Sequence, residues 1–262
     1  MTIGAGARAD SYGAPPGDLA RALDALVAAY PGHLASHDGK MLSWRDGTRM
    51  PVSDGRTDKD FETLLRQPDI DDMFAFPYPP GKEFKTPGKN DDPGRIRFLP
   101  LFLKMYGDCR RGEVTGRLRE IVWLPNSAGL RIKVTTANGV DRALEAVSAE
   151  LDGRKELAPY LAPLSGIYNC RPVADTGQLS AHGFAAAIDL NIKYADYWLW
   201  ARRKPRKGAL WRNRYPLEIV EIFERHGFIW GGKWGHFDTM HFEYRPELLI
   251  AAGARPILPR PR

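Results

Sequence analysis

Residues 180–191 read SAHGFAAAIDLN, a short apolar run that starts beside His182 and ends at Asp189. Its length and its lack of polar residues are typical of a strand that is buried on both faces. A charged aspartate at the end of such a strand is costly unless a partner compensates its charge. A bound metal ion would be one such partner, so this stretch suggests both a core strand and a ligand site.

A second stretch, residues 227–244, reads GFIWGGKWGHFDTMHFEY. His241 lies between two apolar residues of a strand-like run, so we expect it to be enclosed as well. Two imidazoles and one carboxylate are the ligand set of a catalytic zinc ion, which keeps its fourth position for water. A lone buried histidine is more often an ordinary core residue, and three such residues at arbitrary spacing would not establish a site.

The surrounding pattern predicts an α+β fold, in which helices pack on a small antiparallel sheet. We expect amphipathic helices from residue 18 to residue 30 and over 216–226, a short helix over 61–65 and a further helix over 140–151. We expect strands over 119–124, 130–135, 165–173, 185–190, 228–230 and 239–244, and a hairpin over 41–52 around Asp46-Gly47.

Three regions follow from this organisation. Residues 1–16 are rich in Gly, Ala and Pro and predict a flexible arm. Residues 17–138 carry no recognisable chemical motif and form an N-terminal elaboration or a small module of unknown role. They include a Pro- and Gly-dense surface loop over 76–94. Residues 139–262 contain both ligand stretches and form the expected catalytic domain.

The composition excludes few classes of function. The chain of 262 residues carries a net charge of +6, which suits an anionic partner such as nucleic acid or a cell-wall polymer. No nucleic-acid motif supports the first of these partners, so we expect no nucleic acid. We find no run of 18 apolar residues and no convincing signal peptide. The spacing of the two cysteines, Cys109 and Cys170, does not decide whether they pair.

Together, the two stretches resemble the zinc D-Ala-D-Ala carboxypeptidase family, which includes the vancomycin-resistance dipeptidases and carboxypeptidases and the L-alanyl-D-glutamate endolysins. The shared signature is Ser-x-His, a small-residue segment ending in Ala-x-Asp, and a later acidic residue before a His-Phe pair. The resemblance covers about residues 140–250 and implies a hedgehog-like peptidase fold. This chain departs from it at Ala185, where the family usually has Gly, and we expect close packing to survive this change.

The resemblance implies a role for each matching residue. His182, Asp189 and His241 would bind one zinc ion. Asp238 would be the catalytic carboxylate that takes a proton from water and passes it to the leaving amine. Glu243 is the rival base, since it lies two residues from His241 and on a strand would share its face.

Four further residues are candidates for contacts with the substrate. Arg171 matches an arginine upstream of the first ligand, and its guanidinium suits a carboxylate or a developing oxyanion. Ser180 would contact substrate or the ligand shell, and Trp234 could line a peptide cleft or simply pack in the core. His236 could be a fourth ligand, donate to the transition state or be an ordinary loop residue, and we favour the last two. The basic run over residues 202–207 could hold an anionic cell-wall polymer or be a solvated loop.

The function that these expectations favour is zinc-dependent hydrolysis of a peptide bond in peptidoglycan stem peptides, of either D,D-carboxypeptidase or L-alanyl-D-glutamate endopeptidase type. Such an enzyme would act at the periplasm or cell wall. The alternative is a non-catalytic binding module on the same zinc fold. The presence of Asp238 discriminates between them, because a degenerate member would be expected to lose the base before the ligands.

Overall fold

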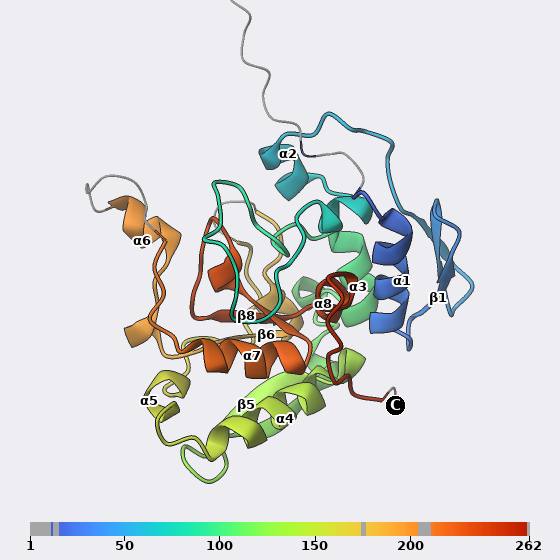
Figure 1. Cartoon of the computed structure of the whole chain (residues 1–262). Helices are drawn as coiled ribbons and strands as arrows, with labels where there is room; N and C mark the ends of the chain where they lie inside the picture. Colours follow the sequence, from blue (N-terminus) through green and yellow to red (C-terminus); the bar gives the residue numbers. More distant parts are fainter. Residues whose placement is uncertain (1–11, 13–15, 174–176, 204–210, 261–262) are drawn as a thin grey trace, which may run out of the picture.

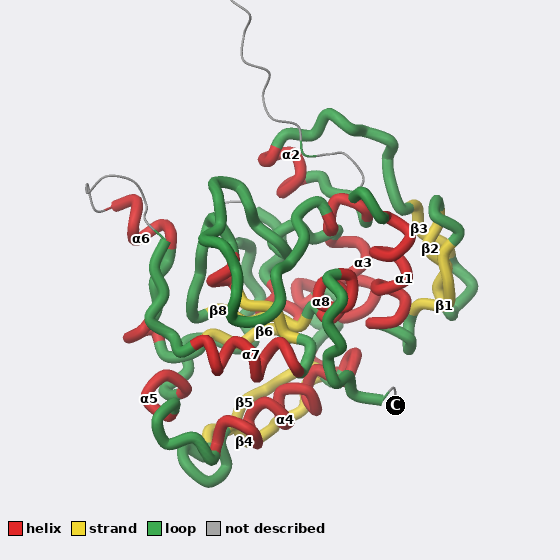
Figure 2. The backbone as a smooth tube through the Cα atoms, viewed as in Figure 1, coloured by secondary structure: helices red, strands yellow, loops and turns green. Residues whose placement is uncertain are grey.

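A computed structural model describes residues 12, 16–173, 177–203 and 211–260 of the chain. These residues form an α+β structure of three small antiparallel sheets with helices packed around them (Figures 1 and 2). The predicted fold class is therefore confirmed at this level. Part of the basic run (204–207) and nearly all of the arm over 1–16 lie outside the described residues.

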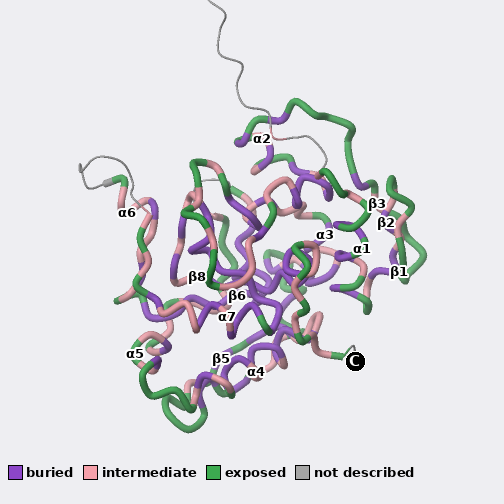
Figure 3. The backbone as a smooth tube through the Cα atoms, viewed as in Figure 1, coloured by how far each residue is buried: buried purple, intermediate pink, exposed green. Residues whose placement is uncertain are grey.

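The central sheet has three strands in the order β6-β8-β7. Their bounds are Ala187–Asp189 (β6), His241–Tyr244 (β8) and Phe228–Trp230 (β7). Every residue of the three strands is buried, as the predicted apolar runs require (Figure 3). The register of β6 and β8 places Asp189 directly opposite His241. Two residues that are 52 positions apart in sequence thus become neighbours.

Two helices and a two-stranded sheet cover this central sheet on one side. Helix α7 (Leu217–Arg225) lies along β7 and buries its apolar face, including Ile219, Ile222 and Phe223. Helix α4 (Val140–Asp152) packs between α7 and the hairpin of β4 (Leu118–Trp123) and β5 (Leu130–Thr135). All four elements agree with the predicted ranges to within two residues.

The first helix of the N-terminal region packs against the last helix of the chain. Helix α1 (Leu19–Ala29) begins at Asp18, whose carboxylate accepts from the backbone N–H of Arg21, and it lies against α8 (Pro246–Ala251). The Tyr30 hydroxyl donates to Glu247 of α8 at 2.6 Å. One hydrophobic core is continuous through residues of both halves of the chain. The N-terminal region therefore shares a core with the segment that carries the ligand stretches.

The remaining elements connect these layers. The predicted hairpin is present as β2 (Met41–Trp44) and β3 (Arg49–Pro51), and it is extended by β1 (Leu34–His37), which we did not predict. The other helices are α2 (Phe61–Arg66), α3 (Leu99–Tyr106), α5 (Ala158–Leu161) and α6 (Trp198–Arg203). Short 3₁₀ turns lie at Asp71–Phe74 (η1), Cys109–Arg111 (η2), Thr115–Arg117 (η3), Ala137–Gly139 (η4), Ala181–Phe184 (η5), Ile192–Tyr194 (η6) and Gly231–Lys233 (η7).

Two sequence predictions were wrong in part. The strand expected over 165–173 is absent, and this segment makes only isolated bridges, Gly166 with Asp189 and Pro172 with Leu179. The loop over 76–94 is irregular as predicted, but its two ends are not on the surface. Tyr78 near its start is buried against Trp230 at the end of β7, and Asp92 near its end is buried against His236 in the segment that leads to β8.

Two further findings concern the whole chain. Cys109 and Cys170 form a disulfide, which ties η2 to the segment just before the first ligand stretch. Across the described ranges, no helix combines the length and the apolar composition needed to cross a membrane.

Candidate metal centre

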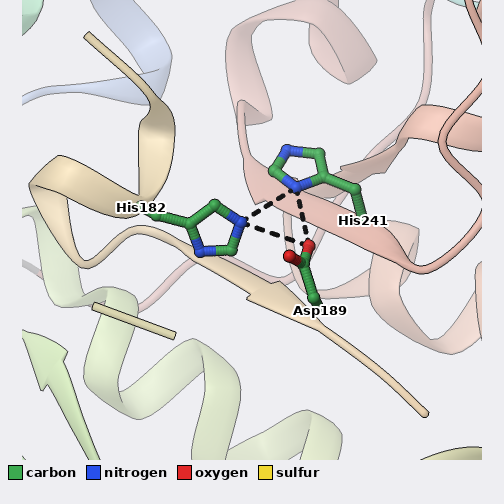
Figure 4. Close-up of side chains that lie close together, drawn as sticks. All are labelled: His182, Asp189 and His241. Atoms are coloured by element: carbon green, nitrogen blue, oxygen red, sulfur yellow. Dashed lines mark hydrogen bonds and ion pairs between the residues drawn. The ribbon is translucent and has the colours of Figure 1, made fainter. Parts of the chain in front are cut away.

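His182, Asp189 and His241 converge at one point of the structure, from η5, the end of β6 and the start of β8 (Figure 4). His182 Nε2 lies 3.2 Å from His241 Nδ1. Asp189 Oδ1 lies 3.1 Å from the first of these nitrogens and 3.0 Å from the second. All three side chains are buried. The structure therefore brings together the three predicted ligands.

This triangle fits a zinc ion. Ligands about 2.0–2.1 Å from a tetrahedral zinc ion lie about 3.3 Å from one another, close to the three separations in the structure. Two imidazoles and a carboxylate are also a donor set that zinc accepts. A second group of acidic residues, Asp69, Asp71 and Asp72, is also close-set, but Lys59 already forms ion pairs with two of its members.

Backbone contacts fix the orientation of His182. Its Nδ1 donates to the carbonyl oxygen of Ile167 at 2.6 Å, which leaves Nε2 free to face the other two ligands. Ser180 precedes η5 and accepts from the backbone N–H of His182 at 3.3 Å. The segment around Gly166, wrongly predicted as a strand, thus provides the wall behind the first ligand.

Ala185, which stands where the family usually has glycine, lies in the turn after His182. This residue ends η5 with φ of 53° and ψ of 34°, in the left-handed region that disfavours residues with a Cβ. The family's glycine at this position thus matches a backbone requirement. Close packing instead constrains Gly183, where an added Cβ would lie 2.8 Å from Leu179 Cδ1 and 3.2 Å from Cys109 Sγ.

Asp189 is held as a carboxylate. Burial alone would raise its pKa, but the two neighbouring imidazoles hold the pKa well below its usual range. Its backbone N–H donates to Gly166 and its carbonyl accepts from Ser165, so both sides of the residue are anchored. A carboxylate that is already ionised is suited to bind a cation.

His241 is held from the side opposite to the triangle. Its Nε2 lies 3.0 Å from Glu243 Oε2, and because a carboxylate accepts, this contact places the ring proton on Nε2 and turns Nδ1 toward the other ligands. Burial alone would lower its pKa, but hydrogen bonds to Asp189 and Glu243 raise the pKa of His241 to about 10.

Asp238 differs from the other carboxylates near the centre. Its Oδ1 is buried and, among the described residues, has no hydrogen-bond partner. Burial, together with the charge of Asp189, raises the pKa of Asp238 to about 7. A carboxylate with one unpartnered oxygen and a pKa near neutrality is suited to accept and return a proton.

Glu243, the rival base, is fully engaged. Its Oε1 accepts from Arg97 at 3.2 Å and Arg245 at 3.3 Å, and its Oε2 faces His241 and Arg97. Burial alone would raise its pKa, but Arg97 and His241 hold the pKa well below its usual range. These contacts suit a residue that orients His241 and leave Asp238 as the better candidate base.

Trp234 and His236 lie on the segment before β8 and are anchored by the N-terminal loop. The Trp234 ring packs against His241 with centroids 5.5 Å apart, and its Nε1 donates to Pro93 O at 2.6 Å. His236 Nδ1 lies 2.7 Å from Asp92 Oδ2. Trp234 is buried against the candidate ligand His241, whereas His236 keeps part of its side chain exposed, and a contact of either residue with substrate stays a prediction.

Arg171 and Ser180 lie beside His182, and the side chain of neither residue forms a hydrogen bond with the three atoms of the triangle. The carbonyl of Arg171 accepts from the Ser180 N–H at 3.1 Å, so the arginine sits next to η5. Its side chain is exposed, and among the described residues it makes no hydrogen bond or ion pair. Ser180 is buried as the cap of η5. A contact of either residue with substrate stays a prediction.

Several contributing residues were not found from the sequence. Ile167 acts through its backbone carbonyl, so its residue type carries no signal. Asp92 and Arg97 come from the N-terminal region and are more than 140 positions from their partners His236 and Glu243. No local pattern marks such distant pairs, although the excess of charged residues over 89–97 is visible in the sequence.

Comparison with known proteins agrees with this site. The family model for D-alanyl-D-alanine carboxypeptidase matches residues 174–244. This segment contains the three candidate ligands, Ser180 and Asp238, while Arg171 lies just before it. The family resemblance predicted from the sequence is therefore confirmed over this segment. No curated protein and no solved structure matches the chain.

Proposed function

We propose that this chain is a zinc-dependent peptidase that hydrolyses a peptide bond in peptidoglycan stem peptides. The observation that carries this proposal is the near-equilateral triangle of His182 Nε2, His241 Nδ1 and Asp189 Oδ1, together with the buried carboxylate of Asp238, whose Oδ1 has no hydrogen-bond partner among the described residues. The match of residues 174–244 to the carboxypeptidase family model supports the same reaction class.

Each residue has a distinct role in this mechanism. A zinc ion held by the triangle would supply a Lewis acid for the scissile carbonyl and lower the pKa of water. Asp238 takes the proton from the attacking water and passes it to the leaving amine. Arg171, exposed beside η5, steadies the negative charge of the substrate carboxylate or of the tetrahedral intermediate.

The organisation of the chain follows from these roles. We propose that residues 139–262 form the catalytic domain, with the hedgehog-like peptidase topology, and that residues 17–138 are an elaboration around it. Trp230 and the Gly231-Gly232 pair slightly favour the L-alanyl-D-glutamate endopeptidase over the D,D-carboxypeptidase. The disulfide and the substrate class both suit an oxidising compartment outside the cytoplasm.

Digestion of purified muropeptides, read by mass spectrometry, tests this function. We expect products that differ from the substrate by one hydrolysed peptide bond, with loss of activity in chelator and recovery on adding zinc. Loss of a terminal D-alanine identifies the carboxypeptidase, and cleavage after L-alanine identifies the endopeptidase. A zinc-loaded protein that binds muropeptides and cleaves none would instead support a non-catalytic binding module.

A further inference from the structure

His241 depends on a chain of buried charges that begins outside the family-like segment. Glu243 faces His241 Nε2 at 3.0 Å and is itself held by two guanidinium groups, those of Arg97 and Arg245. The side chain of Glu243 is 1% exposed, so its charge has almost no contact with water. A buried carboxylate of this kind is stable only if its charge is compensated nearby.

Arg245 alone does not provide this compensation. It also pairs with Glu247, which is fully buried, and donates to the carbonyl of Gly94 at 2.7 Å. Two buried carboxylates, Glu243 and Glu247, therefore share it. Arg97 supplies the second positive charge that balances the group. It reaches Glu243 through both Nε and Nη2, which is the two-point contact that fixes a carboxylate in orientation as well as in charge.

Arg97 belongs to the strap, by which we mean residues 91–97, at the end of the N-terminal loop. The first residues of the strap contact the segment before β8, and the later ones reach β8 itself and Arg245 just after it. The carbonyl of Asp91 accepts from Gly235, Asp92 binds His236, Pro93 accepts from Trp234, and Gly94 accepts from Arg245. In Figure 1 this part of the chain lies beside the orange-red segment that leads to β8.

We propose that Arg97 and Glu243 are positioning residues for the metal ligand His241, so that the N-terminal region completes the metal centre. This inference rests on the proposed function, because it takes His241 to be a ligand. Glu243 holds the ring through Nε2 and so presents Nδ1 to the metal, and Arg97 holds Glu243. An outer partner of a histidine ligand typically contributes 10- to 100-fold to metal affinity, as an order of magnitude.

The test compares zinc affinity, measured by competition with a chromophoric chelator, in the full-length protein and three variants. Arg97→Met removes the charge and both contacts, and Arg97→Lys restores the charge without the two-point contact. Arg119→Met is the matched control, because Arg119 likewise bridges two carboxylates, Asp141 and Glu145, but both lie on α4. The visible spectrum of Co²⁺ in place of zinc gives a second readout, which reports ligand geometry.

We expect Arg97→Met to weaken zinc binding by about 10- to 100-fold and to change the Co²⁺ spectrum. Arg97→Lys should recover part of both, and Arg119→Met should leave both as in the wild type. Wild-type affinity and spectrum in a folded Arg97→Met protein would overturn the positioning role alone, as would equal losses in the Arg119 control. A wild-type chain that binds no zinc would instead overturn the proposed function.

Discussion

His241 shows how residue-level contacts define this site. Its ring is held by Glu243 on one nitrogen and faces Asp189 and His182 with the other. His182 is held in the same way by the carbonyl of Ile167. In both cases an outer hydrogen bond selects which nitrogen faces the centre, which is the usual arrangement for histidine ligands.

The raised pKa of His241 predicts that zinc binding releases a proton. With a pKa of about 10, the ring is protonated at neutral pH in the metal-free protein, whereas a ligand must be neutral at Nδ1. Zinc affinity should therefore rise with pH, by about tenfold per unit, and stop rising near pH 10. Calorimetry in buffers of different ionisation enthalpy should show about one proton released at pH 7. Affinity that is flat between pH 6 and pH 8 would contradict this reading.

The substitution Asp238→Asn tests the assignment of the base. It keeps the shape of the side chain but removes its ability to take a proton, so we expect hydrolysis to slow by about 10²- to 10⁴-fold while zinc stays bound. Asp91→Asn, a change at an exposed carboxylate of the strap, is the control and should retain activity. If Asp238→Asn remains active and Glu243→Gln does not, the base has been assigned to the wrong carboxylate.

Much of the site at this scale was predictable from the sequence. His182, Asp189, Asp238 and His241 lie in two short stretches whose residue types already suggest zinc chemistry. The burial of Asp189 follows from its place at the end of an apolar run. The role of Glu243 was not settled by the sequence, because its distance from His241 fits both a base and an orienting residue. The partner Arg97, 146 positions away, separates the two readings.

Among the secondary-structure elements, the pairing of β6 with β8 does most to form the site. Their antiparallel register sets Asp189 opposite His241, and η5 returns His182 to the same point. The strands themselves were predictable from their apolar runs, but their register was not, since pairing between distant strands depends on the whole core. The segment over 165–173 was misread because Ile167 and Tyr168 look strand-like, whereas its backbone serves the ligands.

The segment before β8 is also fixed by a buried lysine. Lys233 of η7 is fully buried and donates to Glu224 of α7 and to the carbonyls of Pro79 and Gly81, at 2.7 and 2.8 Å. The substitution Lys233→Met leaves the Glu224 charge uncompensated, so we expect the free energy of unfolding to fall by about 3–5 kcal/mol.

Urea unfolding followed by tryptophan fluorescence measures this change. Lys82→Met is the matched control, because Lys82 pairs with Glu221 at the surface and its side chain is 52% exposed. Solvent screens that exposed pair, so its loss should leave the free energy of unfolding nearly unchanged. Equal effects of the two substitutions would show that the buried pair does not fix the segment.

At the scale of the whole molecule, the two halves of the chain are joined through one core and one disulfide. The α+β class could be predicted because helical and strand periodicities alternate along the sequence. The way in which the N-terminal region packs could not, because its contacts are long-range. Tyr30 meets Glu247 across 217 positions, and Tyr78 meets Glu224 across 146. These contacts explain why residues without a chemical motif can still shape the site.

Anomalous diffraction at the zinc absorption edge, from crystals of the zinc-loaded protein, tests whether the three side chains hold one zinc ion. We predict one anomalous peak per chain, roughly 2.0–2.2 Å from His182 Nε2, His241 Nδ1 and an oxygen of Asp189. A peak elsewhere, or a structure in which the two imidazoles face different pockets, would rule out this ligand set.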